Sequence, residues 1–382
     1  MFSADASFRR RMAIDARLHS GGSIVGIQFM LSAGLALLRG ARPTVSGAAA
    51  VLALAIIGAM IGSAARAEPI RGAGSTLAAP IIGKWATTYK AARADGGDFF
   101  TLDWTVDYEP VGSLAGLMRL AQPELDFAAT DVPQQGDDLA RNGQQQFPIV
   151  MGGIAVVANL DGLPEQGLRL SGPSWSDPAI RVLNPDIALP DLAISVIHRQ
   201  DGSGSTYVFT EFLSSTSEDW KTKLGADTLI DWPLGTGAEG TQALLSAVAA
   251  SKGAIAYAEY GQVLRAGLPF AAVQNKSGKF VKPDPQGVQA AATSVAWGET
   301  TDFFASLTNR SGDGAYPIST AVFAVVQVAG RSEHRYRRVH DLFRLAFAQG
   351  AGDATALGYV PLPKALIGQI EQYWARQLPV GN

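Results

Sequence analysis

Apolar runs of strand length alternate with segments of helical periodicity along residues 68–382. Helical spacing of apolar residues follows glycine-marked turns in "IIGKWATTYKAARA", "LAGLMRLAQ" and "YVFTEFLSS". The strand candidates between them are "LDWTVDYEPV", "LDFAAT", "IVMGGIAVVANL", "LAISVIHR", "GAIAYAEY" and "TAVFAVVQV". This alternation predicts α/β organisation. A chain of 382 residues is expected to form two domains, and without an obvious linker it should cross between them more than once.

The first 67 residues have the pattern of a targeting segment rather than of a folded domain. Arg39 and Arg42 precede the long uncharged run "VSGAAAVLALAIIGAMIGSAA", and "ARA" then fits a small-x-small cleavage site ending at Ala67. We expect a signal peptide, cleavage after Ala67 and export to the periplasm. An uncleaved membrane anchor is the alternative, and Met30 is a second candidate for the start of translation.

Charge and composition exclude several classes of function. Residues 1–67 hold seven of the 31 basic and two of the 34 acidic residues, so the remainder has 24 basic and 32 acidic side chains and a net charge of −8. That balance argues against a nucleic-acid partner. Four histidines and no cysteine argue against zinc sites, thiol chemistry and iron–sulfur clusters, and no metal or other cofactor is expected. An anionic ligand would have to be attracted by local geometry.

Three turns rich in glycine and serine precede predicted helices: "GAGST" (72–76), "VGSLAG" (111–116) and "DGSGST" (201–206). Each brings unpaired N–H groups and a hydroxyl to a helix N-terminus, which is an arrangement that attracts anions. Any one of them is also an ordinary cap or turn. Three in one chain favour an anion site.

Arg199 ends an apolar strand directly before the third turn, where an open sheet has its binding edge. Its guanidinium can make a bidentate contact to an oxyanion, and Asp201 can hold the guanidinium in place. The alternative is a surface ion pair of little energetic consequence.

Asp131 ends the strand "LDFAAT" and would repel a fully ionised anion. It could instead accept a hydrogen bond from the proton that hydrogen phosphate carries, which would discriminate against sulfate. The alternative is a cap or turn before Pro133.

With these residues assembled, the chain resembles the periplasmic phosphate-binding proteins of phosphate-specific ABC transporters from about residue 70 to its end. The matching segments are "GAGSTLAAPIIGKWATTY", "YEPVGSLAG", "DFAATDVP", "FPIVMGGIAVVANLDG", "HRQDGSGSTYVFTEFLS", "WPLGTGAEG", "GAIAYAEY" and "YPISTAVF". The resemblance implies a type II periplasmic binding protein, in which two α/β lobes joined by two crossing segments close on the ligand. Lobe one would comprise 68–152 and 275–382, and lobe two 153–274.

The resemblance also implies a ligand set, a partner and an oligomeric state. The phosphate contacts would be Thr76 with the backbone of Ser75 and Leu77, then Ser113, Asp131, and Arg199 with Ser203, Gly204 and Ser205; Asp201 would support Arg199. The protein would be a monomer that binds inorganic phosphate and delivers it to ABC permease subunits. A phosphate or arsenate sensor or scavenger without a transporter stays open as an alternative.

Three features depart from the family pattern. Leu114 stands where a small or polar residue is usual, and Ser205 replaces a threonine. A helical segment is missing between Ser174 and Trp175, so lobe two should be shortened near 171–176, without loss of a ligand residue.

An enzyme is the competing class of function. Ser203 and His198 could suggest a hydrolase, but no G-x-S-x-G elbow is present in a suitable setting, and no lysine follows "GSGST" as a P-loop requires. His340 lies in "RSEHRYRRVHDLF", which we interpret as a basic, exposed helix start. We therefore expect no catalytic activity.

Overall fold

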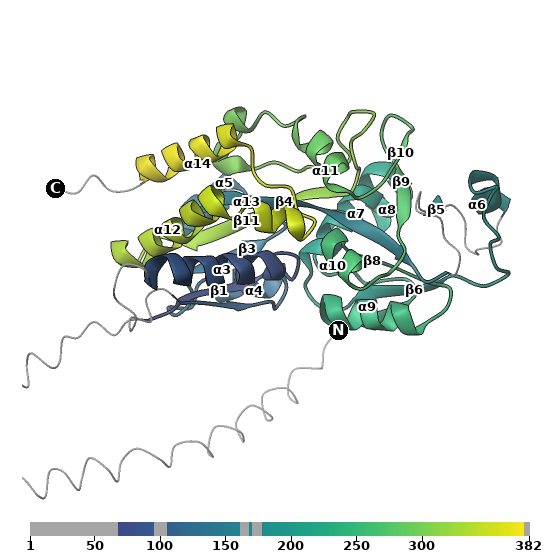
Figure 1. Ribbon diagram of the computed structural model, residues 1–382, viewed down its shortest axis with the longest axis horizontal. Helices are drawn as coiled ribbons and strands as arrows, with labels where there is room; N and C mark the ends of the chain where they lie inside the picture. The colour runs from purple at the N-terminus through teal and green to yellow at the C-terminus, as the bar shows by residue number, and fades with distance from the viewer. Residues whose placement is uncertain (1–67, 95–104, 161–167, 170–177, 378–382) are drawn as a thin grey trace, which may run out of the picture. The chain divides into compact units, whose positions relative to one another are not determined.

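The computed structural model describes residues 68–94, 105–160, 168–169 and 178–377 (Figure 1). The predicted signal peptide and the predicted shortening near 171–176 lie outside the described residues. The expected alternation of helices and strands is confirmed, and the element order is that of an α/β protein.

The main sheet has eight strands in the order β2-β1-β3-β11-β4-β8-β6-β7. Their bounds are β1 (Ile70–Gly74), β2 (Val106–Glu109), β3 (Phe127–Thr130), β4 (Gln144–Ala158), β6 (Ser195–Arg199), β7 (Thr236–Ala238), β8 (Ala254–Glu259) and β11 (Ser319–Gln327). Strands β2, β1 and β3 are parallel to one another, as are β8, β6 and β7. The central strands β11 and β4 run antiparallel to their neighbours.

Strand β4 connects the two halves of this sheet. Its 15 residues are apolar over most of their length and almost all buried, as expected for a strand covered on both faces. Residues up to Gly153 pair with β11, and residues from Ile154 onward pair with β8. Strand β4 therefore changes its pairing partner between Gly153 and Ile154, next to the predicted lobe boundary between residues 152 and 153. The assignment of residues to the two lobes stays a prediction.

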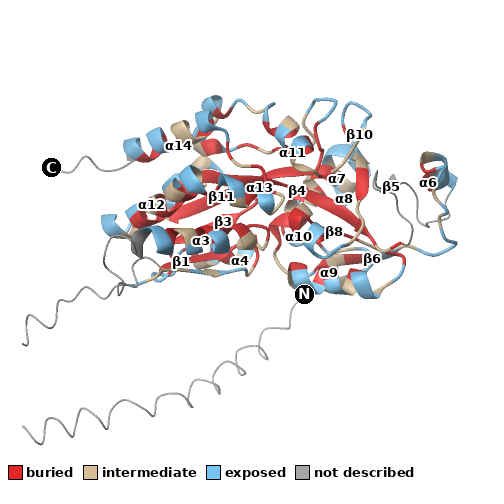
Figure 2. Ribbon diagram, viewed as in Figure 1, coloured by how far each residue is buried: buried red, intermediate tan, exposed pale blue. Residues whose placement is uncertain are grey.

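Helices pack against both halves of the sheet, with buried strands inside and exposed outer helix faces (Figure 2). Helix α4 packs on β1 and β3, and α9 packs on β6 and β8. The helices are α3 (Ala79–Ala94), α4 (Ser113–Arg119), α5 (Gly136–Asn142), α6 (Pro178–Leu183), α7 (Gly204–Thr216), α8 (Glu218–Lys223), α9 (Gly240–Ala250), α10 (Tyr260–Arg265), α11 (Pro285–Ala292), α12 (Glu333–Gln349), α13 (Ala351–Ala356) and α14 (Lys364–Gln377), with short 3-10 turns at Trp297–Glu299 and Thr301–Phe303. A small sheet joins β10 (Phe280–Val281), β9 (Ala271–Gln274) and β5 (Leu168–Arg169).

The interpretation of His340 as part of an exposed helix start is wrong. His340 is buried on α12 and stacks on Trp374, with ring centroids 4.6 Å apart and planes 9° from parallel. Phe147 meets both rings edge-on. Burial lowers the pKa of His340 to about 4, so this imidazole is a neutral member of the core.

Candidate functional site

The candidate site lies where three strands of the main sheet end and helices begin. Strand β1 ends at Gly74 and runs on into α3, parallel β3 ends at Thr130 just before Asp131, and β6 ends at Arg199. The carboxyl ends of β1 and β3 lie at one edge of their half of the sheet, which is where open α/β sheets bind ligands. Strand β6 runs in the opposite direction, because β11 and β4 between the two halves are antiparallel to their neighbours. The ends of these strands still meet, since Arg199 Nη1 donates to the Thr76 hydroxyl at 3.2 Å, and the structure brings the predicted ligand residues together there.

Ser75 links the first turn to Asp131. The buried Ser75 hydroxyl donates to the Asp131 Oδ1 atom at 2.7 Å. The Ser75 hydroxyl oxygen also accepts the N–H groups of Leu77 and Ala78, at 3.1 and 3.3 Å. The Ser75 N–H donates to the carbonyl of Ala129 at 2.8 Å. We expected the backbone N–H groups of Ser75 and Leu77 to be ligand donors, but both have acceptors within the protein. Ser75 extends the ladder with β3, and its hydroxyl closes the turn that leads into α3.

The second turn contacts both the first and the third turn. The Ser113 hydroxyl accepts the backbone N–H of Asp131 at 3.3 Å. Gly112 has a φ of 87°, which favours glycine, and its N–H donates to the Gly74 carbonyl at 2.9 Å. The Leu114 N–H donates to the Gly202 carbonyl at 3.2 Å. Leu114, where we expected a departure from the family pattern, therefore lies at the point where the second turn meets the third.

Arg199 is buried and its guanidinium is held on both sides. Nε donates to Asp201 Oδ1 at 2.5 Å, and Nη2 is paired with Asp201 Oδ2. Nη1 donates to the hydroxyls of Thr76 and Thr241 at 3.2 and 3.1 Å. The prediction that Asp201 holds the guanidinium is confirmed, and the alternative of a surface pair is wrong because Arg199 is only 2% exposed.

The third turn ends in α7, which begins at Gly204. The Ser203 hydroxyl accepts the Thr206 N–H at 3.3 Å and caps the helix, and Ser203 and Ser205 are both buried. Gly204 lies so close to the other turns that a Cβ there would be 2.2 Å from Asp131 Oδ2 and 2.3 Å from the Ser113 hydroxyl. Only glycine fits at this position, so the third turn is in direct contact with the second turn and with Asp131.

Asp131 is the carboxylate of this cluster, and its environment makes it easy to protonate. Burial raises its pKa to about 6, against the opposing effects of the Ser75 hydrogen bond, the Arg199 charge and the Ser113 hydrogen bond. Asp201 behaves differently: burial alone would raise its pKa, but the hydrogen bonds and charge of Arg199 outweigh burial and lower it. Asp201 is therefore a permanent counter-ion to Arg199, whereas Asp131 can exchange a proton near neutral pH.

Two further residues lie at the site and were missed from the sequence. Tyr257 receives the Arg199 backbone N–H at 3.2 Å and bonds to the Thr206 hydroxyl at 2.7 Å. Thr241 contacts the Arg199 guanidinium from the start of α9. The segment "WPLGTGAEG" directly before it is glycine-rich, so the criterion applied to the other turns could have found Thr241.

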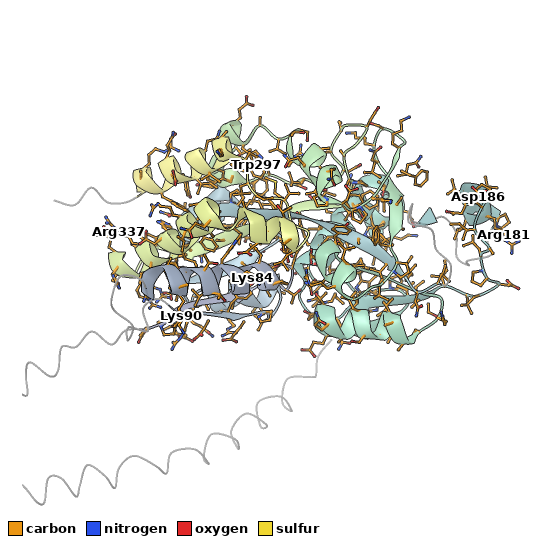
Figure 3. The ribbon with its side chains drawn as sticks, viewed as in Figure 1. Lys84, Lys90, Arg181, Asp186, Trp297 and Arg337 are labelled. Carbon is orange, nitrogen blue, oxygen red and sulfur yellow. The ribbon has the colours of Figure 1, made fainter. Side chains whose placement is uncertain are left out.

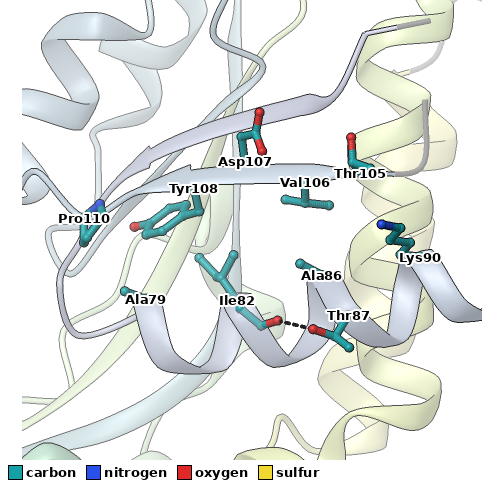
Figure 4. Close-up of a pocket in the computed structure, with 11 residues that line it drawn as sticks. Ala79, Ile82, Ala86, Thr87, Lys90, Thr105, Val106, Asp107, Tyr108 and Pro110 are labelled. Atoms are coloured by element: carbon teal, nitrogen blue, oxygen red, sulfur yellow. Dashed lines mark hydrogen bonds between the residues drawn. The ribbon is translucent and has the colours of Figure 1, made fainter. Parts of the chain in front are cut away.

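Several exposed charged side chains and one surface cavity lie away from the predicted ligand residues. Lys84, Lys90 and Arg337 are exposed on α3 and α12, in contrast to the buried Arg199 (Figure 3). A cavity of about 510 Å³ lies between α3 and β2, and none of the predicted ligand residues lines it (Figure 4). In the part of the chain that the structure describes, no His, Asp and Glu residues cluster as metal ligands, and no helix is both long and apolar enough to cross a membrane.

Comparison with known proteins gives a consistent family. A family model described as a PBP superfamily domain matches residues 61–334. The phosphate-binding protein PstS of Xylella fastidiosa (strain Temecula1) is 35% identical over 319 residues, which cover 81% of this chain and 85% of the relative. The phosphate-binding protein PstS of Pasteurella multocida is 34% identical over 336 residues, which cover 85% and 95%.

Solved structures share the fold. A phosphate-binding protein from Stenotrophomonas maltophilia matches with a TM-score of 0.58 at 18% identity, covering 80% of this chain and 93% of that one. A putative phosphate ABC transporter substrate-binding protein from Clostridium perfringens, solved with bound phosphate, matches with a TM-score of 0.54 at 17% identity, covering 78% and 100%. The predicted type II periplasmic binding-protein architecture is confirmed.

Proposed function

The chain belongs to the PBP superfamily and, within it, to the family of phosphate-binding proteins PstS, and we propose that it binds inorganic phosphate for an ABC-type import permease. The observation that carries this proposal is the buried carboxylate of Asp131 beside the Ser75 and Ser113 hydroxyls. Hydrogen phosphate is an oxyanion that still carries a proton, so it offers one donor to Asp131 and several acceptors to the other groups.

We propose that the ligand contacts are the Thr76, Ser113, Ser203 and Ser205 hydroxyls, the turn around Gly204, the carboxylate of Asp131 and the guanidinium of Arg199. The hydroxyls and the guanidinium donate to oxyanion oxygens. Ser75 acts through its hydroxyl on Asp131, and Leu77 through the shape of the first turn. Asp201 keeps Arg199 in place, as its two contacts to the guanidinium indicate.

Selectivity against sulfate follows from the same carboxylate. Sulfate has no proton to donate, so its negative charge would face that of Asp131 in a buried setting. Burial makes such repulsion strong because little water is present to screen it. Discrimination therefore comes from a group that disfavours the competitor rather than from an extra attraction to phosphate.

We propose that lobe one comprises 68–152 and 275–382, that lobe two comprises 153–274, and that they enclose the ligand. The enclosure is supported by contacts between residues assigned to different lobes, such as the Leu114 N–H to the Gly202 carbonyl and Arg199 Nη1 to the Thr76 hydroxyl. The role is binding and delivery without catalysis, and the protein acts as a monomer in the periplasm after cleavage at Ala67.

The proposal is tested on protein exported from the full chain and recovered from the periplasm. Intact mass establishes whether cleavage occurs after Ala67. The recovered protein, stripped of bound anion, is titrated with phosphate and then with sulfate in a calorimeter. One-to-one phosphate binding with no sulfate heat supports the proposal, and a folded protein that binds no phosphate contradicts it.

A further inference from the structure

Thr241 lies at a junction of the site that none of the three predicted turns includes. It is 5% exposed near the start of α9, and its hydroxyl oxygen is 3.0 Å from the Thr76 hydroxyl and 3.1 Å from Arg199 Nη1. The third side of this triangle, from Arg199 Nη1 to the Thr76 hydroxyl, is 3.2 Å. The two threonine hydroxyls and the Arg199 guanidinium, which come from separate segments of the chain, are thus each within hydrogen-bond distance of the other two.

The chemistry of these groups restricts the direction of each hydrogen bond. A guanidinium only donates, so both threonine oxygens accept from Arg199 Nη1. Each hydroxyl has a single proton and two lone pairs, and only one proton can lie between the two oxygens. If Thr241 donates to Thr76, the Thr76 oxygen receives two donors and its own proton is directed out of the triangle.

Both threonines are held in place from outside the triangle. The N–H of Gly240, next to Thr241, donates to Asp201 Oδ1 at 3.1 Å, so the start of α9 is fastened to the same carboxylate as Arg199. On the other side, the Gln262 side chain donates to the Thr76 carbonyl at 3.0 Å. The Glu259 carboxylate in turn accepts the Gln262 backbone N–H at 2.8 Å. The hydroxyl-to-hydroxyl contact is therefore built into the fold.

We propose that Thr241 is a positioning residue, which donates to the Thr76 hydroxyl and so directs the Thr76 proton to a phosphate oxygen. This role rests on the proposed phosphate-binding function. An oxyanion site needs hydroxyls that donate, and a free threonine hydroxyl rotates among several directions. With Thr241 and Arg199 both donating to it, the Thr76 oxygen has one proton left and one direction in which to offer it.

The test is a double-mutant cycle in the exported full chain, with calorimetric titration of inorganic phosphate. Thr241→Val keeps the shape and removes the hydroxyl, and we expect it to weaken phosphate binding by about 3- to 10-fold, the effect of one hydrogen bond. Thr241→Ser, which keeps the hydroxyl, should stay within about 2-fold of the parent. In a Thr76→Val background, Thr241→Val should change the affinity by less than about 2-fold, because its target is gone.

Thr236→Val is the matched control, since it makes the same substitution at an exposed position on β7 just before α9. It should bind phosphate as the parent does. Thermal midpoints are measured for every variant, and Thr241→Ala takes the place of Thr241→Val if the valine variant does not fold.

Two results would overturn the role of Thr241 while leaving phosphate binding intact. One is a parent-like affinity of Thr241→Val, and the other is an equal loss in the parent and Thr76→Val backgrounds, which would mean that Thr241 acts independently of Thr76. A parent protein that is folded but binds no phosphate would overturn the proposed function itself. The parent titration is therefore made before any variant is compared.

Discussion

The Ser75 hydroxyl donates a 2.7 Å hydrogen bond to the Asp131 carboxylate across 56 positions of sequence. Both groups are buried, at 0% and 2% exposure. This bond favours the charged form of Asp131, while burial favours the protonated form and raises the pKa to about 6. The result is a carboxylate that is ionised at neutral pH and can accept a hydrogen bond from a protonated ligand, which is the property that the proposed selectivity needs.

Replacing Asp131 with asparagine should weaken the preference for phosphate over sulfate by about tenfold or more, equivalent to about 1.4 kcal/mol. The amide carries no charge to repel sulfate, and its nitrogen can donate to a sulfate oxygen. Phosphate affinity should fall because the acceptor for its proton is weakened. The measurement is a calorimetric competition between the two anions.

The matched control for this change is Asp186→Asn, at an exposed aspartate in the loop after α6. It should leave both affinities as they are in the parent. An unchanged phosphate-to-sulfate ratio in a folded Asp131→Asn protein would remove Asp131 from the selectivity mechanism.

Glu259 should make the ligand-free protein less stable as the pH rises from about 5 to about 7.5. Burial raises its pKa to about 7, against the opposing backbone hydrogen bonds of Gly261 and Gln262. The folded state therefore holds this proton more tightly than the unfolded state does. Its stabilising contribution is complete below the unfolded pKa and is lost as the pH rises through the folded pKa, at up to about 1.4 kcal/mol per pH unit.

The measurement is urea unfolding between pH 5 and pH 8 in phosphate-free buffer, with Glu259→Gln beside the parent. The free energy of unfolding of the parent should fall relative to that of the variant across this range. The difference isolates Glu259 from Asp131, which acts in the same direction, and from His340, whose lowered pKa acts in the opposite one. Parallel curves would show that Glu259 does not titrate in this window, and Glu371→Gln on α14 is the exposed control.

Arg199→Ala should weaken phosphate binding by about 10- to 150-fold, the range of about 1.5–3 kcal/mol for a hydrogen-bonded charged group. The change also leaves Asp201 without the partner that lowers its pKa, so a negative charge faces the anion. Calorimetry measures the loss. Arg141→Ala, at an exposed arginine on α5, is the control, and an Arg199→Ala affinity within about threefold of the parent would place Arg199 outside the site.

Local sequence signals predict the contacts of the site that form between residues close together in the sequence. Arg199 and Asp201 are two positions apart, and their pairing was expected because a strand end and a glycine-rich turn fix their relative placement. The α/β architecture followed from hydrophobic periodicity in the same way. These features need no knowledge of how distant segments meet.

What the sequence could not predict depends on pairings between distant segments. The Ser75 N–H donates to the carbonyl of Ala129 because β1 and β3 pair in one particular register. Thr241 meets Arg199 across 42 positions, since the start of α9 is fastened to Asp201. His340 was misjudged because the basic residues around it suggested exposure, whereas its own side of α12 packs on Trp374.

Gly204→Ala should reduce phosphate affinity by about tenfold or more and lower the free energy of unfolding by about 1–3 kcal/mol. The backbone of Gly204 is outside the left-handed region, so its conformation allows alanine. The cost comes only from the steric contact of the added methyl group. The added methyl group would lie 2.2 Å from Asp131 Oδ2 and 2.3 Å from the Ser113 hydroxyl, and α7 would have to move away from both.

Gly368→Ala on α14 is the control, because its added methyl group meets nothing within 4 Å. There the same substitution should stabilise the protein by about 0.5–1 kcal/mol, since alanine loses less chain entropy in a helix, and should leave phosphate affinity unchanged. Urea unfolding and calorimetry on the two variants separate the general effect of alanine from the contact at the site. If Gly204→Ala binds phosphate as tightly as the parent, the third turn does not need to approach Asp131 this closely for binding.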